Sequence, residues 1–188
     1  MGAPDTQWPR YEVFQQTRPG GRYQNVGSVH APDPEIALQN ARDVFVRRPQ
    51  TVSLWVVPAG EILARTREEL EKDPSWRRPA PPPAGATEKV YHVFQKRSQR
   101  RSMGYVTHSG EVRAANRDQA LLRAWEQFGE GPVFVWWIVP AGAITSSEEA
   151  DVASMFQPAQ DKSYRLPGVY HTRTLMREAK KQQEEDKA

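Results

Sequence analysis

The sequence predicts an α+β protein with two repeated β-β-α-β modules, each a small antiparallel sheet with one packed helix, together forming a pseudo-dimer. The main observation is an internal repeat. Tyr11-Glu-Val-Phe-Gln15 returns as Tyr91-His-Val-Phe-Gln95, and Trp55-Val-Val-Pro-Ala-Gly60 returns as Trp137-Ile-Val-Pro-Ala-Gly142. In each copy, runs typical of strands flank one run with helical spacing. Ordered blocks that return at nearly constant spacing indicate a duplicated module, and such a fused pair suits two similar partners.

The first expected module spans residues 8–72 and begins with a hairpin. Its turn contains Pro19, which restricts φ, and the pair Gly20-Gly21, which permits positive φ. Asp33 followed by Pro34 is a favoured helix start, and the apolar spacing after it predicts one buried helix face. The elements expected here are strands at 11–17 and 23–31, a helix at 34–47 and a buried strand at 52–57.

The second expected module spans residues 88–147 and repeats this order. Asn116 is a favourable helix cap, and a glycine-rich stretch ends the helix before the last strand. The elements expected here are strands at 89–97 and 103–114, a helix from the cap to residue 128 and a buried strand at 133–139.

The segments outside the two modules differ from them in composition. Residues 73–87 are rich in Pro and Ala, so we expect a stiff, extended linker, preceded by a short helix at 66–72. Residues 148–171 form an irregular closing segment, and residues 172–188 a charged, helix-prone tail. Four large side chains of the closing segment are expected to be exposed: Met155, Phe156, Tyr164 and Tyr170.

Charge and composition narrow the class of protein. The chain has 188 residues, with 26 basic against 23 acidic residues and a net charge of +3, and the basic residues are scattered. Nucleic-acid binding would concentrate charge on one face, so we do not expect it. The sequence has no Cys, which fits a reducing compartment. Because no apolar run is long enough to span a membrane and the N-terminus does not resemble a signal peptide, we expect a cytoplasmic protein without membrane contact.

Catalytic patterns are absent from the sequence. The four histidines, His30, His92, His108 and His171, show no metal-ligand spacing. There is no phosphate-binding glycine loop and no nucleophile elbow. We therefore predict a protein that is not an enzyme, with no catalytic residue, no cofactor and no metal. An enzyme acting on CoA esters, with Arg side chains gripping phosphates, is a third hypothesis, but no nucleophile with a supporting base favours it.

Aromatic side chains on the predicted sheets allow a different function. Such side chains beside basic turns are typical of sheets that stack RNA bases, so a small RNA-binding module is the alternative hypothesis. The same side chains also suit a hydrophobic core. Trp136 and Trp137 must point to opposite faces of their strand, and an outward Trp would mark a partner surface. The side chains concerned are Tyr11, Phe14, Trp55, Tyr91, Phe94, Trp136 and Trp137.

Long motifs of the first module and of the closing segment resemble one family. They are Trp8-Pro-Arg-Tyr-Glu-Val-Phe14, Val26-Gly-Ser-Val-His-Ala31, Ala37-Leu-Gln-Asn-Ala-Arg-Asp43, Arg47-Arg48, Ser53-Leu-Trp-Val-Val57 and Phe156-Gln-Pro-Ala-Gln-Asp-Lys-Ser-Tyr-Arg-Leu-Pro-Gly-Val-Tyr170. With them the chain is similar to the PaaB family, the B-type component of the multicomponent ring-1,2-phenylacetyl-CoA epoxidase. The resemblance is strong over residues 8–63 and 153–170 and weaker over 88–145. Family members are single modules, so this chain looks like one module fused to a diverged dimer partner.

The resemblance implies a function in aerobic phenylacetate catabolism. The PaaB component would be a non-catalytic bridge that holds together the catalytic di-iron and structural subunits of the epoxidase and carries no metal itself. The reductase is a further candidate partner. Arg and Tyr are frequent interface anchors, although an Arg pair also suits a helix C-terminus. The residues expected at the partner interface are Trp8, Tyr11, His30, Arg47, Arg48, Phe156, Asp161, Lys162, Tyr164, Arg165 and Tyr170.

Overall fold

An eight-stranded antiparallel sheet with packed helices dominates the protein. The computed structural model describes residues 7–46, 51–82, 85–99, 105–148, 150, 152–157, 174–178 and 182. The strand order is β4-β7-β5-β6-β2-β1-β3-β8. All pairs are antiparallel, so the predicted class, α+β with an antiparallel sheet, is confirmed.

The first half of the sheet is built on β1, which pairs with both β2 and β3. The Asp33 side chain accepts a hydrogen bond from the backbone N–H of Ile36 at 2.8 Å, as expected for a helix cap. The helix then ends at Phe45, earlier than the predicted end. The elements of this half are β1 Arg10–Gln16, β2 Gln24–His30, α1 Pro34–Phe45 and β3 Ser53–Pro58.

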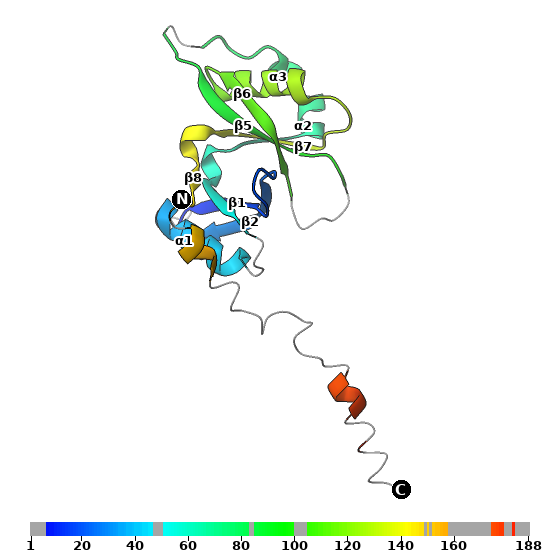
Figure 1. The fold of residues 1–188 in the computed structure, drawn as a ribbon. Helices are drawn as coiled ribbons and strands as arrows, with labels where there is room; N and C mark the ends of the chain where they lie inside the picture. The colour runs from blue at the N-terminus through cyan, green and yellow to red at the C-terminus, as the bar shows by residue number, and fades with distance from the viewer. Residues whose placement is uncertain are drawn as a thin grey trace.

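The second half is built on β5, which pairs with both β6 and β7. Asn116 caps its helix by accepting a hydrogen bond from the N–H of Gln119 at 2.8 Å. The described part of the second strand begins at Thr107, after the predicted start at Met103, which lies outside the described residues. The elements are β5 Lys89–Lys96, β6 Thr107–Ala114, α3 Arg117–Phe128 and β7 Val135–Pro140. Figure 1 shows the strands lying between α3 of the second half and α1 of the first half.

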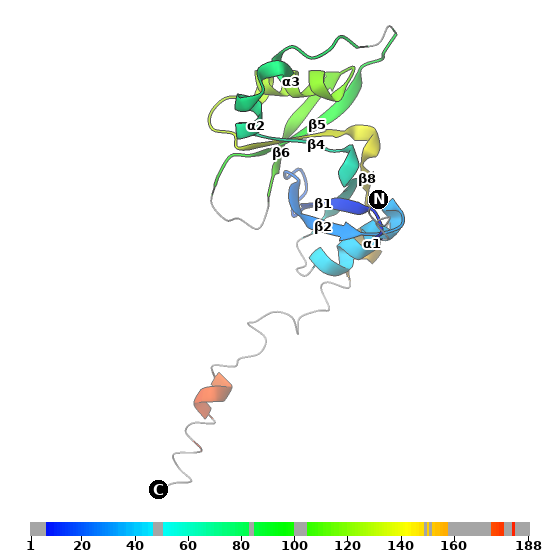
Figure 2. The same cartoon turned by 180° about the vertical axis from the view of Figure 1, so that it is seen from behind.

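Two segments cross from one half to the other. After β3, a short turn leads into β4, which pairs with β7 of the second half; Figure 2 draws β4 with the strands of that half. After β7, a similar turn leads into β8, which pairs with β3 of the first half. These short edge strands were not predicted. The elements are η1 Ala59–Glu61, β4 Leu63–Thr66, α2 Arg67–Lys72, η2 Pro74–Arg77, η3 Ala141–Ala143, β8 Thr145–Ser146 and α4 Val152–Phe156.

The crossing segments also contribute to the cores that they reach. Leu70 of α2 lies in the core under α3, and Phe156 of α4 lies in the core under α1. The prediction that Phe156 is exposed is therefore wrong, since its exposed fraction is 6%. A segment that looks irregular in sequence can still be buried when a distant half of the chain supplies the surface that covers it.

A third core joins the two halves on the sheet face away from the helices. Phe14 and Phe94 are fully buried there, with ring centroids 4.3 Å apart. Trp136 packs under α3, whereas Trp137 packs against the shared core, 6.1 Å from the ring of Phe14. The two tryptophans point to opposite faces, as predicted, but the second is covered by the other half of the chain.

The halves are also joined through the backbone in the middle of the sheet. Asn25 donates its backbone N–H to the carbonyl of Val106 at 2.9 Å, and His108 donates its own to the carbonyl of Tyr23 at 2.8 Å. The strands β2 and β6 thereby make one continuous sheet. None of the described helices is long and apolar enough to cross a membrane.

Candidate functional site

Two of the predicted interface residues lie together at the start of the first half. Trp8 is 59% exposed, and its carbonyl oxygen lies 2.7 Å from Nδ1 of His30, which can donate to it. The backbone oxygen of His30 accepts a hydrogen bond from Asn40 of α1 at 3.1 Å. The arm before β1, the end of β2 and the helix thus support one exposed indole.

Two other predicted interface residues lie in the core. Tyr11 is 5% exposed and Phe156 is 6% exposed, and both belong to the cluster under α1. Core packing alone explains why these two large side chains are there. A contact with a partner stays a prediction for both. The remaining predicted interface residues lie outside the described residues: Arg47, Arg48, Asp161, Lys162, Tyr164, Arg165 and Tyr170.

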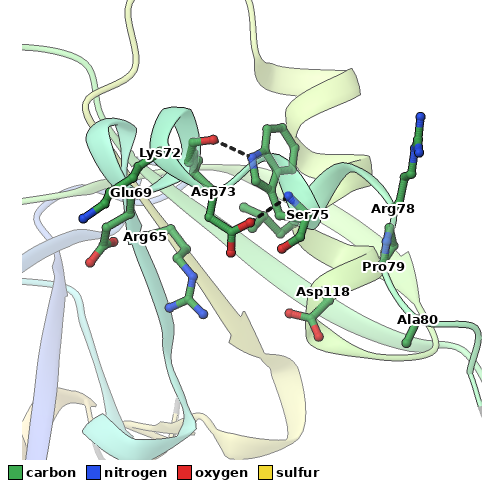
Figure 3. A pocket seen from close by; sticks show the side chains of 12 residues that line it. Arg65, Glu69, Lys72, Asp73, Ser75, Arg78, Pro79, Ala80 and Asp118 are labelled. Atoms are coloured by element: carbon green, nitrogen blue, oxygen red, sulfur yellow. Dashed lines mark hydrogen bonds between the residues drawn. The ribbon is translucent and has the colours of Figure 1, made fainter.

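A surface hollow of about 660 Å³ lies where the first crossing segment meets α3. Figure 3 shows that its charged side chains come mainly from β4, α2 and the stretch that follows, with Asp118 facing them from α3. Trp76 forms part of its wall and donates its indole N–H to the carbonyl of Leu70 at 2.9 Å. The full lining is Arg65, Glu69, Leu70, Lys72, Asp73, Ser75, Trp76, Arg78, Pro79, Ala80, Asp118 and Leu121.

Two of the acids in this hollow serve its local fold. Asp73 accepts a hydrogen bond from the N–H of Ser75 at 3.0 Å, and hydrogen bonds from Ser75 hold the pKa of the Asp73 carboxyl below its usual value. Glu69 completes a capping box with Thr66, which lowers the pKa of the Glu69 carboxyl. Both carboxylates are therefore ionised and cap the short helices of this stretch. Arg and Lys side chains line the same hollow.

A second polar cluster lies on the hairpin of β5 and β6. Nδ1 of His92 lies 3.1 Å from Nε2 of His108 and 3.5 Å from Oε1 of Glu111. His92 pairs with Glu111 across the two strands, and a bulge after Val93 then brings His108 to the same face. Sequence spacing alone missed this cluster, which we call the His-His-Glu cluster; hairpin register was the signal that could have found it.

The two imidazoles of the His-His-Glu cluster are partly buried, whereas Glu111 is exposed. The ring centroid of Trp55, from the first half, lies 5.0 Å from that of His92 and 6.2 Å from that of His108. Desolvation by burial lowers the pKa of His92, and desolvation together with the neighbouring His92 lowers the pKa of His108 to about 4. Both imidazoles are consequently neutral near pH 7.

The geometry defines an α+β protein whose two halves exchange edge strands and share a core. Sequence comparison gives its family. The sequence model described as "Phenylacetic acid degradation B" matches residues 7–79 and again residues 88–177, so the chain belongs to this family. The resemblance found in the sequence is confirmed, and the two separate matches agree with a tandem duplication.

One curated relative shows which known protein the chain resembles. Over 62 residues, the chain is 50% identical to the B-type component of the 1,2-phenylacetyl-CoA epoxidase of Escherichia coli (strain K12). The aligned stretch is 33% of this chain, and the chain spans 65% of the length of that relative. No solved structure matches the chain.

Proposed function

We propose that this chain is a non-catalytic bridging subunit of a multicomponent phenylacetyl-CoA epoxidase in aerobic phenylacetate catabolism. Catalysis resides on other chains, and this chain holds catalytic and structural subunits at a defined spacing. Family membership supports the pathway, and the name of the relative from Escherichia coli supports the complex. The expected cytoplasmic location belongs to the same proposal.

The double family match carries the proposal. Each match covers a strand-strand-helix-strand segment, and each segment sends its following strand to the sheet of the other. A chain of this kind is equivalent to a dimer of family modules made in one polypeptide. The finer fold that we propose is therefore two repeated modules in a pseudo-dimer, which presents two related surfaces to partners.

The exposed indole of Trp8 is our first candidate for a partner contact. A large exposed aromatic side chain held by a rigid support is a frequent hot spot of interfaces, and the hydrogen bond from His30 to its carbonyl supplies that support. The Arg pair and the predicted residues of the closing segment after Phe156, which lie outside the described residues, complete the proposed interface.

The RNA-binding alternative receives little support from five of the seven aromatic residues that suggested it. Phe14, Phe94 and Trp136 are fully buried, and Tyr11 and Tyr91 are 5% and 4% exposed. Side chains in these positions are not free to stack on bases. They are buried because they pack in the two cores under the helices and in the core between the halves.

Co-expression with the other epoxidase subunits tests the proposal. We expect the tagged chain to recover the catalytic and structural subunits in one complex, with two catalytic units per chain by native mass spectrometry. Iron should accompany the catalytic subunits, and the epoxidase lacking this chain should lose its higher-order assembly.

A matched pair of variants makes the test specific. Trp8→Ala should weaken recovery of the partners, whereas Leu175→Ala removes a similarly exposed apolar side chain, 61% against 59%, and should not. Turnover of a CoA ester by the purified chain alone would contradict the non-catalytic assignment. Failure to recover any epoxidase subunit would contradict the bridging role.

A further inference from the structure

We propose that His92, His108 and Glu111 form a Zn²⁺-binding site that ties β5 to β6 in the second half of the sheet. Its three ligands come from two neighbouring strands. Two imidazoles and one carboxylate are a ligand set that Zn²⁺ uses in proteins.

The distances between the ligand atoms fit one small cation. In a tetrahedral site with metal–ligand distances of about 2.0–2.1 Å, neighbouring ligand atoms lie about 3.3–3.5 Å apart. Nδ1 of His92 lies 3.1 Å from Nε2 of His108 and 3.5 Å from Oε1 of Glu111. One ligand atom from each of the three side chains lies within 4.8 Å of the others, so small rotations of the Glu111 side chain bring the third ligand into place.

The two imidazoles already face one another through nitrogens that could bind a metal. Zn²⁺ binds neutral imidazole, and the contact between Nδ1 of His92 and Nε2 of His108 brings two such nitrogens to within 3.1 Å of each other. Without a metal, one ring donates its N–H to the other across the 3.1 Å contact. Metal binding replaces that hydrogen bond, and the donating ring takes its other tautomer.

The exposure of the ligands gives the ion an entrance. The side chain of His92 is 12% exposed and that of Glu111 is 56% exposed, so a cation can enter past the carboxylate. Three protein ligands leave a fourth position, which water fills.

The corresponding place in the first half cannot hold the same ion. There, Glu12 and Ser28 occupy the paired positions and Asn25 follows the bulge. Glu12 and Asn25 stand where the second half has His92 and His108, and Ser28 stands where it has Glu111. The Asn25 side-chain amide donates to the Glu12 carboxylate at 3.1 Å, and an amide and a hydroxyl are poor substitutes for an imidazole and a carboxylate as Zn²⁺ ligands. The proposal therefore predicts one Zn²⁺ per chain, in the second half.

Metal titration of the full chain tests the site. The purified protein is stripped with EDTA, dialysed and titrated with Zn²⁺ by calorimetry and with Co²⁺ by visible spectroscopy. We expect one equivalent to bind, with the d–d absorption of tetrahedral Co²⁺ and a thermal midpoint that rises with Zn²⁺ concentration. His108→Gln should weaken binding more than the roughly 100-fold reached by loss of a residue that only orients a ligand.

His30→Gln is the matched control, because His30 is on the equivalent hairpin of the first half but bonds to a backbone carbonyl. It should bind Zn²⁺ as the wild-type chain does. Nitrogen NMR of the histidine rings keeps the test valid if a cluster variant fails to fold. Zn²⁺ should shift the signals of Nδ1 in His92 and Nε2 in His108.

Two outcomes would overturn the proposal. One is the absence of stoichiometric binding to the wild-type chain. The other is binding that survives His108→Gln while the NMR signals of other histidines move, which would mean an adventitious ion only.

Discussion

The first two strands of each half pair through a bulge at the same place, yet the polar side chains beside it differ. The bulge follows Val13 in the first half and Val93 in the second. Next to it the first half carries Glu12 and Asn25, joined by a hydrogen bond, whereas the second half carries His92 and His108. Both halves have the same backbone irregularity, but the polar side chains beside it differ in kind.

Each bulge also has a glycine beneath the last Phe of the helix. Gly27 has a φ of +138° and Gly110 a φ of +157°. A Cβ added to Gly27 would lie 2.8 Å from the ring of Phe45, and one added to Gly110 would lie 2.5 Å from the ring of Phe128. The helix can therefore pack closely on the sheet only because these positions lack a side chain.

The largest predicted effect tests whether the two halves are one cooperative unit. Phe14→Ala and Phe94→Ala each remove a fully buried ring of the shared core, and each should lower the free energy of unfolding by about 3–5 kcal/mol. Guanidinium denaturation, followed by Trp fluorescence and far-UV circular dichroism, should show one transition in both variants. Two separate transitions would mean that the halves unfold independently.

The next prediction concerns the crossing segment that ends in α2. Leu70→Ala removes a buried side chain that the first-half sequence contributes to the core of the second half. It should lower the free energy of unfolding by about 2–3 kcal/mol, the low end for a buried Leu, because α2 has only six residues. Glu68→Ala, on the exposed face of the same helix, should change the denaturation midpoint little. Equal effects of the two changes would argue against the crossing.

Replacing the two bulge glycines should destabilise the protein to different extents. Gly27→Ala and Gly110→Ala both force a Phe ring to move, and overpacking of this kind costs about 1–3 kcal/mol. The cost should be greater at Gly110, where the ring is nearer. Thermal unfolding of both variants measures the difference, and adding Phe128→Leu to Gly110→Ala should recover part of the loss. A double variant that is no more stable than the single one would exclude the ring contact as the cause.

The smallest predicted effect depends on pH. Burial raises the pKa of the Glu12 carboxyl, although Asn25 and Arg10 lower it in part. The folded state therefore binds this proton more tightly than the unfolded state, and the ionised carboxylate lowers stability above the folded-state pKa. Glu12→Gln should be more stable than the wild-type chain at pH 7, and the difference should disappear as the pH falls below about 4.5, the ordinary value.

Urea denaturation of both chains between pH 4 and pH 7 measures this dependence. A difference that grows as the pH falls would mean that the interactions of Glu12 with Asn25 and Arg10 outweigh its desolvation. The first half would then use this position as a stabilising ion pair, and the contrast with the His-His-Glu cluster would need another explanation.

Local signals in the sequence predicted most of the secondary structure. Asp33 with Pro34, and Asn116, marked the helix starts because capping depends on residues three positions apart. Period-two alternation marked the strands in the same way. The candidate sites were predicted less well. His30 and Trp8 do lie together, but Phe156 was expected on the surface and is buried.

The sequence by itself determined the strand-strand-helix-strand order of each half, the two capped helices, the internal repeat and the family. All of these are set by neighbours within a few turns of chain or by recurring blocks of residues. Only the tertiary structure decided that β4 pairs with β7 and β8 with β3, and that Trp55 covers His92. These contacts join residues far apart in the chain, and their free energy comes from burying surfaces that no local pattern describes.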